Sequence, residues 1–165
     1  MRSTESRIQN KFLELLEYTP IENITVVLIC KELNIKRQTF YYHFQSIYDV
    51  IYSIFYIKRI EIDESLNFEK NIGLLQGFFE KNKVLCDGIE NSFASDILLE
   101  YCSSFVFRLI ITLGKATKNI NDVAKFFAKP IAQIIIDNYK KEEKSAKVIV
   151  ESLKRNNHTL LDILS

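Results

Sequence analysis

A short stretch from Asn34 to Ser46 carries side chains that can form hydrogen bonds with the edges of base pairs. Arginine pairs best with guanine and glutamine with adenine, so Arg37 and Gln38 are the candidates for reading base identity. Lys36 and His43 add local positive charge, and the stretch contains no acidic residue. The alternative is that Arg37 and Gln38 are simply solvated, as most such side chains are.

Two short helices joined by a tight turn are expected to position these side chains. The first, Thr25–Leu33, opens on a threonine whose hydroxyl can cap free amide groups. The turn contains Asn34, the non-glycine type that best tolerates a positive φ. In the second helix Phe40 and Phe44 lie one turn apart and are expected to point inward. The outer face, an apolar area that DNA could cover, then carries Arg37, Gln38, Tyr41 and Tyr42.

The run Thr39-Phe40-Tyr41-Tyr42-His43-Phe44 carries a resemblance to a known family. It is similar to the end of the recognition helix in the TetR family of bacterial transcriptional regulators. There, a threonine, an apolar residue, a tyrosine, any residue, a histidine and an aromatic or apolar residue follow a threonine-started helix and a turn. The resemblance extends over roughly residues 5 to 60.

The resemblance implies roles for individual residues. Thr39, Tyr41 and His43 match positions that mostly contact phosphates, and Tyr42 matches a variable position that contacts base or backbone. His43 could instead be a hydrogen-bonded structural histidine. Thr25 could be a cap alone, or also hold a phosphate at its helix N-terminus.

Three features depart from the family pattern. Lys36 replaces the small residue that usually caps the recognition helix, and Ile47 replaces a lysine that usually contacts phosphate. Val27 and Leu28 stand where polar residues are common. These changes concern the anchoring of the DNA backbone rather than the motif itself.

The composition predicts an all-α protein. The chain has 165 residues, 47% of them hydrophobic, with four glycines and two prolines and no linker rich in either. We expect residues 1–48 to form a three-helix DNA-binding domain and residues 49–165 a helical domain for ligand binding and dimerisation. The other expected helices are Ser3–Glu17, Ile47–Asp63, Phe68–Val84, Ser92–Lys115, Asn121–Lys140 and Glu142–Arg155.

Charge and cysteine content narrow the function classes. A net charge of +1 argues against indiscriminate binding to nucleic acid. Three widely spaced cysteines and two histidines predict neither a metal site nor a required disulfide. No apolar run is long enough for a membrane span and the N-terminus is polar, so we expect a cytoplasmic protein without cofactor. Neither a nucleophile–base pair nor a phosphate-cradling loop is present, so an enzyme is not expected.

An apolar stripe in Asn121–Lys140 raises the question of self-association. Its residues are Val123, Phe126, Phe127, Ile131, Ile134 and Ile135, and Ala146, Ile149, Val150 and Leu153 continue the spacing in the next segment. Such faces can pair with a second copy or pack onto the core of the same chain. The family resemblance implies a homodimer formed by the last two long helices. Pro130 should kink the first of them.

The same resemblance implies a small-molecule effector bound in the C-terminal body. Candidate lining residues are Phe78, Tyr101, Phe105, Arg108 and Phe127. Aromatic residues at helical spacing are more often core, and Arg108 could pair with Glu100 rather than with an anionic effector. The resemblance thus implies a repressor that leaves a near-palindromic operator when an effector binds. The alternative is a DNA-binding helical protein controlled by a protein partner or lacking an effector pocket.

Overall fold

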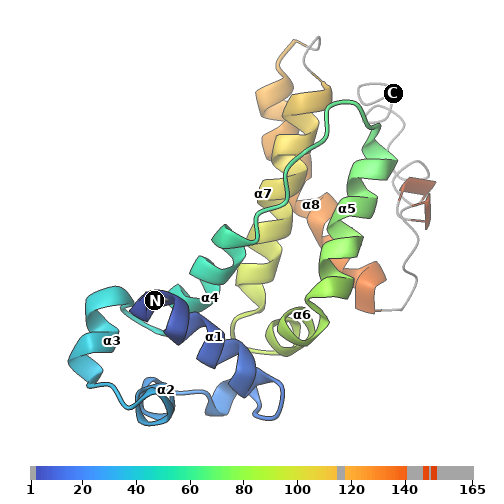
Figure 1. Ribbon diagram of the computed structural model, residues 1–165. Coiled ribbons are helices and arrows are strands. Elements are labelled where there is room, and N and C mark those ends of the chain that lie inside the picture. Colours follow the sequence, from blue (N-terminus) through green and yellow to red (C-terminus); the bar gives the residue numbers. More distant parts are fainter. Residues whose placement is uncertain (1–2, 115–117, 141–146, 149, 152–165) are drawn as a thin grey trace. The chain divides into compact units, whose positions relative to one another are not determined.

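The computed structural model describes residues 3–114, 118–140, 147–148 and 150–151, and every regular element among them is helical (Figure 1). The prediction of an all-α fold is therefore confirmed. The helices are α1 (Thr4–Leu16), the 3₁₀ turn η1 (Ile21–Asn23), α2 (Val26–Leu33), α3 (Arg37–His43), α4 (Ile47–Ile57), α5 (Phe68–Lys81), α6 (Lys83–Glu90), α7 (Ser95–Leu113) and α8 (Ile120–Lys140).

Two helix predictions were wrong in their bounds. The helix predicted to run to Asp63 ends at Ile57, because the backbone beyond it bonds to side chains of other helices. The helix predicted over Phe68–Val84 is interrupted at Asn82, and α6 follows as a separate helix. Most of the predicted Glu142–Arg155 helix lies outside the described residues.

The chain divides into two compact units. The first comprises Met1–Arg59 and Asn82–Leu98, and the second comprises Ile60–Lys81 and Leu99–Ser165. In the first unit α1 is the central helix, in contact with α2, α3, α4 and α6. Its buried face carries Ile8 and Phe12, both fully buried. Gln9 on the same face donates to the Ser53 hydroxyl at 2.9 Å, which ties α1 to α4.

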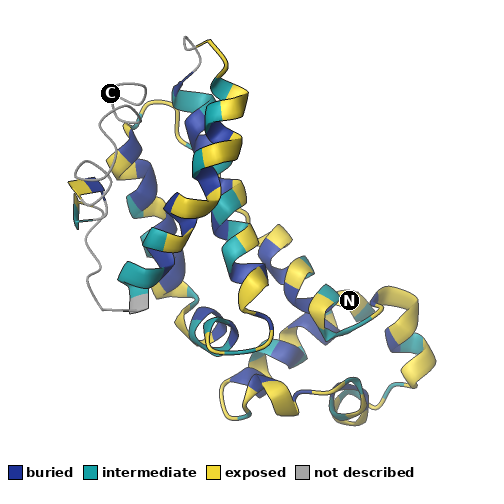
Figure 2. Cartoon of the chain, turned by 180° about the vertical axis from the view of Figure 1, so that it is seen from behind, coloured by how far each residue is buried: buried dark blue, intermediate teal, exposed yellow. Residues whose placement is uncertain are grey.

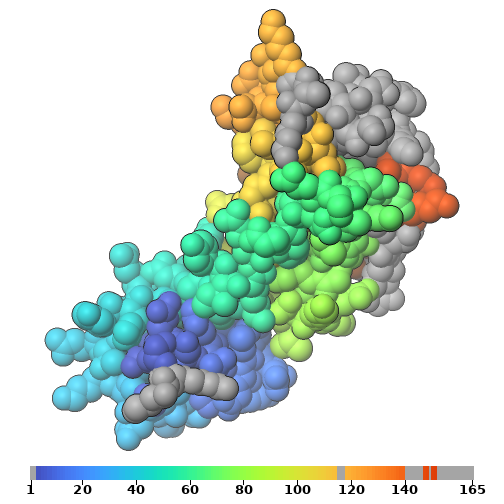
Figure 3. All heavy atoms as spheres, turned by 45° about the horizontal axis from the view of Figure 1, so that its top comes forward, coloured from blue at the N-terminus to red at the C-terminus, as the bar shows by residue number. Residues whose placement is uncertain are grey.

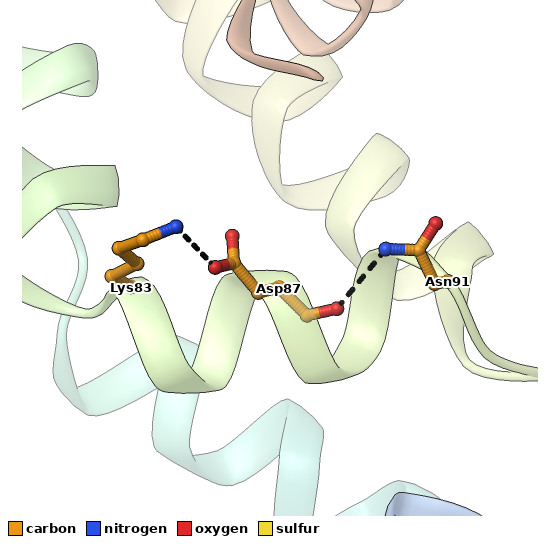
Figure 4. A network of polar contacts seen from close by, with 3 residues as sticks. All are labelled: Lys83, Asp87 and Asn91. Atoms are coloured by element: carbon orange, nitrogen blue, oxygen red, sulfur yellow. Dashed lines mark hydrogen bonds and ion pairs between the residues drawn. The ribbon is translucent and has the colours of Figure 1, made fainter. Parts of the chain in front are cut away.

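Helix α6 completes the first unit and packs on α1. A Cβ added at Gly88 would lie 3.0 Å from Leu16 Cδ1, so the glycine allows close packing between these helices. On the same helix Lys83 forms an ion pair with Asp87, and Asn91 donates to the Asp87 carbonyl at 3.5 Å (Figure 4). The Cys86 side chain is fully buried.

The second unit is built from α5, α8 and the part of α7 from Leu99 on. Phe79 of α5 and Tyr139 of α8 have ring centroids 4.8 Å apart. At the end of α7 a Cβ on Gly114 would lie 2.3 Å from Ile120 Cδ1, so only glycine fits beside the start of α8. Pro130 lies inside α8, where it removes one backbone donor from the helix. In the described part of the chain, no helix has the length and apolar character needed to cross a membrane.

Candidate nucleic-acid interface

Helix α2 begins and ends with the local features that the sequence predicts. The Thr25 hydroxyl accepts a hydrogen bond from the Leu28 amide at 3.2 Å, so the predicted cap is present. Asn34, directly after the helix, has φ 51° and ψ 49°, the left-handed conformation. The Ile35 amide donates to the Cys30 carbonyl and the Asn34 amide to the Lys31 carbonyl, at 3.0 and 3.1 Å. These bonds close the helix end and turn the chain into α3.

Helix α3 is held by aromatic residues on its inner face. Phe40 is fully buried and Phe44, directly after the helix, is buried as well. Their ring centroids are 5.9 Å apart. Both residues therefore point inward as predicted, and the seven residues of α3 turn their remaining side chains outward.

The outward face of α3 is almost wholly exposed (Figure 2). Tyr42 is 85% and Tyr41 54% exposed, values far above those usual for such large rings. The exposed residues at and along the helix are Lys36, Arg37, Gln38, Tyr41, Tyr42 and His43, with Thr39 half-buried. In the space-filling view the side chains of this segment, coloured cyan, project from the surface (Figure 3). The structure thus brings the candidate DNA-binding side chains of α3 onto one outer surface.

Ring contacts order part of this surface. The Tyr42 and His43 rings meet edge to face with centroids 5.1 Å apart, and Tyr41 meets the buried Phe40 ring at 5.7 Å. Tyr41 is thereby fixed to the core by one edge while its other side faces solvent. A ring with a fixed orientation loses less conformational entropy when a ligand covers it.

The ends of α3 differ in how they are anchored. Lys36 precedes the helix and its side chain makes no capping bond in the described structure, as its departure from the family pattern suggested. At the far end the Ser46 hydroxyl accepts from the Asp49 amide at 3.3 Å. The Asp49 carboxylate in turn accepts from the Gln45 amide at 2.7 Å. This reciprocal pair fixes the start of α4 and engages the Asp49 carboxylate in backbone bonding.

Positive charge on α3 reaches back over α2. Burial raises the pKa of the Cys30 thiol, and the Arg37 guanidinium partly opposes this rise, which places Arg37 within electrostatic range of α2. No acidic residue occurs between Asn34 and Ser46 to offset Lys36 and Arg37. This local excess of basic side chains suits contact with a polyanion.

Sequence reasoning missed the role of Arg7. Its Nη2 atom donates to the Leu33 carbonyl at 3.3 Å and so covers the C-terminal end of α2. The partner lies in another helix, so no local pattern could have identified it. Lys11 forms an ion pair with Glu14 at 2.7 Å, and its pKa is raised by this hydrogen-bonded partner.

The candidate effector-binding residues contact different neighbours rather than one shared centre. The Phe78 and Tyr101 rings stack with centroids 5.0 Å apart, and Arg108 lies 5.9 Å from the centroid of the Phe105 ring. Phe127 meets the exposed Phe126 at 5.0 Å. Arg108 also donates to the Ile60 carbonyl at 3.0 Å.

A pocket in the second unit is lined by other residues, namely Gln76, Phe79, Glu80, Ile135 and Tyr139. Its cavity volume is about 10 Å³, which is room for about one water molecule. This pocket is too small for an organic effector. Across the described ranges, no three His, Cys, Asp or Glu side chains come together as metal ligands would.

Comparison with known proteins shows which solved structure has a similar fold. No family model matches the chain, and neither does any curated protein. Among solved structures the chain is similar to the dihydroxyacetone kinase operon activator DhaS, with a TM-score of 0.62 at 17% identity. The similarity covers 98% of this chain and 96% of the other. The chain therefore shares the fold of that structure. At this identity the similarity shows the fold alone.

Proposed function

We propose that this protein is a sequence-specific DNA-binding transcriptional regulator, rather than an enzyme, and that it acts as a homodimer. Residues 1–48 bind DNA, and residues 49–165 dimerise and receive the regulatory signal. The observation that carries the proposal is the outer face of α3, which exposes two tyrosines, an arginine and a glutamine on a helix anchored by Phe40. A soluble protein rarely leaves so much aromatic area exposed unless a partner covers it.

On this proposal the side chains of α3 divide into two groups. Arg37 and Gln38 contact base edges in the major groove, where their geometry suits guanine and adenine. Lys36, Thr39, Tyr41 and His43 contact phosphates and set the register, and Tyr42 contacts base or backbone. The Thr25 hydroxyl is already used by the Leu28 amide, which favours a role as cap.

Dimerisation is supported by α8. Phe126 is 74% exposed there, while Ile131 and Ile135 of the same stripe are buried within their own chain. The stripe thus serves the core of one copy and leaves an aromatic side chain for a second copy. Two recognition helices related by a two-fold axis would enter successive major grooves, about 34–36 Å apart, on a near-palindromic operator.

We propose repression in the cytoplasm, by occupation of a promoter, with release by a small-molecule effector. The name of the similar structure refers to an activator. A reporter assay with the native promoter therefore distinguishes repression from activation. An effector must prefer one state of the protein by at least about 1 kcal/mol to change DNA binding measurably.

A second candidate is a DNA-binding protein controlled by a protein partner. The observation that favours it is the apolar Val27 side chain on α2, which is 50% exposed and could contact a protein partner. A thermal-shift screen against small molecules separates the two. A ligand that shifts the melting temperature and weakens DNA binding supports the first candidate, and intact DNA binding without any ligand response supports the second.

The decisive experiment is selection of bound fragments from the host genome, followed by Arg37→Ala. We expect Arg37→Ala to weaken specific binding by about 1–3 kcal/mol and to relax the preference at one base position. Arg59→Ala, which removes another exposed arginine of the first unit, is the matched control and should leave base preference intact. Unchanged affinity and unchanged base preference in Arg37→Ala would show that α3 is not the reading surface.

A further inference from the structure

The segment between α4 and α5, residues 58–67, is not helical, yet side chains of the second unit hold part of it. Asn71 on α5 is fully buried. Its Oδ1 accepts from the Asp63 amide at 3.0 Å. Its Nδ2 lies 3.0 Å from the Asp63 carbonyl and 3.1 Å from the carbonyls of Leu66 and Asn67. The amide of one side chain thus contacts four backbone groups of this segment.

Arg108 on α7 holds the beginning of the same segment. Its Nη2 donates to the Ile60 carbonyl at 3.0 Å, a bond strengthened by the charge of the donor. Asp63 adds a local lock, because its Oδ1 accepts from both the amide and the hydroxyl of Ser65 at 2.9 and 2.6 Å. These hydrogen bonds lower the pKa of the Asp63 carboxyl. We call residues 58–67 the linker, and Asn71 with Arg108 the clasp.

The linker differs from the other places where the chain passes between the units. One passage is at Asn82, a single residue between α5 and α6, and the other lies within the uninterrupted helix α7. Side-chain hydrogen bonds from Asn71 and Arg108 hold the linker backbone, so a change in those bonds alters its freedom directly.

A buried asparagine is a costly way to fill space. Its amide must give up water, and this cost is recovered only because protein groups replace the lost hydrogen bonds. An apolar residue at position 71 would fill the site without this cost, but it would leave the linker backbone unsatisfied. The chemistry of Asn71 therefore serves the order of the linker rather than the packing of α5.

We propose that the clasp is a positioning device for DNA binding, in that Asn71 and Arg108 limit the freedom of the linker that follows α4. The inference rests on the proposed function as a dimeric DNA-binding protein. When two heads must engage one operator at the same time, each degree of freedom in their connection is lost on binding and lowers the affinity. Engagement of a single half-site carries no such requirement. The clasp therefore affects binding to a full operator and leaves binding to a half-site unchanged.

The test uses the full chain with Asn71→Ala and with Arg108→Met. Two measurements are made: hydrogen exchange over residues 60–67, and affinity for a selected full-site duplex beside the corresponding half-site duplex. We expect faster exchange in both variants, including at the Asp63 amide in Asn71→Ala. We expect a loss of about tenfold in full-site affinity, with half-site affinity within about twofold of wild type.

Leu75→Ala is the matched control, because Leu75 is fully buried on α5 one turn after Asn71. It should reduce stability while leaving linker exchange and the ratio of full-site to half-site affinity as in wild type. Should Asn71→Ala fail to fold, the half-buried Arg108 provides the same test through Arg108→Met.

The outcomes distinguish two failures. Faster exchange with an unchanged ratio of affinities would overturn the positioning role of the clasp alone, and so would unchanged exchange in both variants. A wild-type protein that binds no DNA, or that binds full and half sites equally, would overturn the proposed dimeric regulator and the positioning role with it.

Discussion

Two asparagines hold the two connections that matter most for this chain, and they do so by opposite means. Asn34 is exposed and acts through its backbone, which adopts φ 51° between α2 and α3. Asn71 is fully buried and acts through its side chain, which bonds the backbone of the linker before α5. The first role depends on intrinsic conformational preference and the second on partners up to eight residues away. The connection near the proposed DNA-binding surface is thus locally encoded, and the connection in the body is not.

The largest expected effect concerns the buried anchor behind the Asn34 turn. We expect Phe40→Ala to reduce the free energy of unfolding by about 3–5 kcal/mol, because it leaves a cavity under α3. Chemical denaturation measures this loss.

Tyr42→Ala, two residues further along the same helix, is its control. We expect a change in unfolding free energy within about 0.5 kcal/mol, together with weaker DNA binding, since Tyr42 is mostly exposed. Equal stability losses in the two variants would mean that the inner and outer faces of α3 are not as distinct as their burial indicates.

Substitution of the two asparagines should have an intermediate effect on the free energy of unfolding. Asn34→Ala should cost about 1 kcal/mol because alanine disfavours a positive φ, whereas Asn34→Gly should be nearly neutral. At position 71 both substitutions should cost about 1–3 kcal/mol, because each removes the same buried hydrogen bonds. Equilibrium unfolding of the four variants measures the contrast. A large gain from glycine over alanine at position 71 would contradict the side-chain role of Asn71.

The smallest expected effect is a pH dependence within the first unit. Burial, assisted by the neighbouring Asp87 carboxylate and opposed by Lys58, raises the pKa of Cys86 to about 12 from an ordinary value of 9.0. Above pH 9 the unfolded chain loses the thiol proton and the folded chain keeps it, so stability falls as pH rises from 9 toward 12. Between pH 9 and 10 the expected contribution is about 1 kcal/mol.

Unfolding curves of wild type and Cys86→Ala between pH 8 and 10 measure this contribution. Lysine and tyrosine side chains also titrate in this range, and both proteins share them. The steeper decline should therefore belong to wild type, and parallel curves would show that Cys86 is not buried as described.

The contrast between the asparagines explains which parts of the fold could be predicted from the sequence. The cap at Thr25, the turn at Asn34 and the inward rings of Phe40 and Phe44 depend on neighbours within a few residues, and all four were predicted. The contact of Arg7 with the Leu33 carbonyl joins separate helices and was not predicted.

The end of α4 shows why periodicity alone was insufficient. Ile60 and Ile62 continue the apolar spacing beyond Ile57, which favoured a longer helix. The Arg108 and Asn71 side chains instead bond to the backbone of Ile60 and Asp63, and these partners lie too far along the chain for a local pattern to reveal. The DNA-contacting roles of the α3 side chains remain predictions, although their shared exposure is observed.

The brevity of α3 has a thermodynamic consequence. Seven residues are about half the length at which an isolated helix becomes even marginally populated in water, so this helix has no independent existence. It forms only while Phe40 and Phe44 are enclosed, and melting of the surrounding core abolishes it at once. Substitutions that destabilise the surrounding core would then abolish operator binding as completely as a substitution of Arg37. They would do so by lowering the fraction of molecules in which α3 is folded.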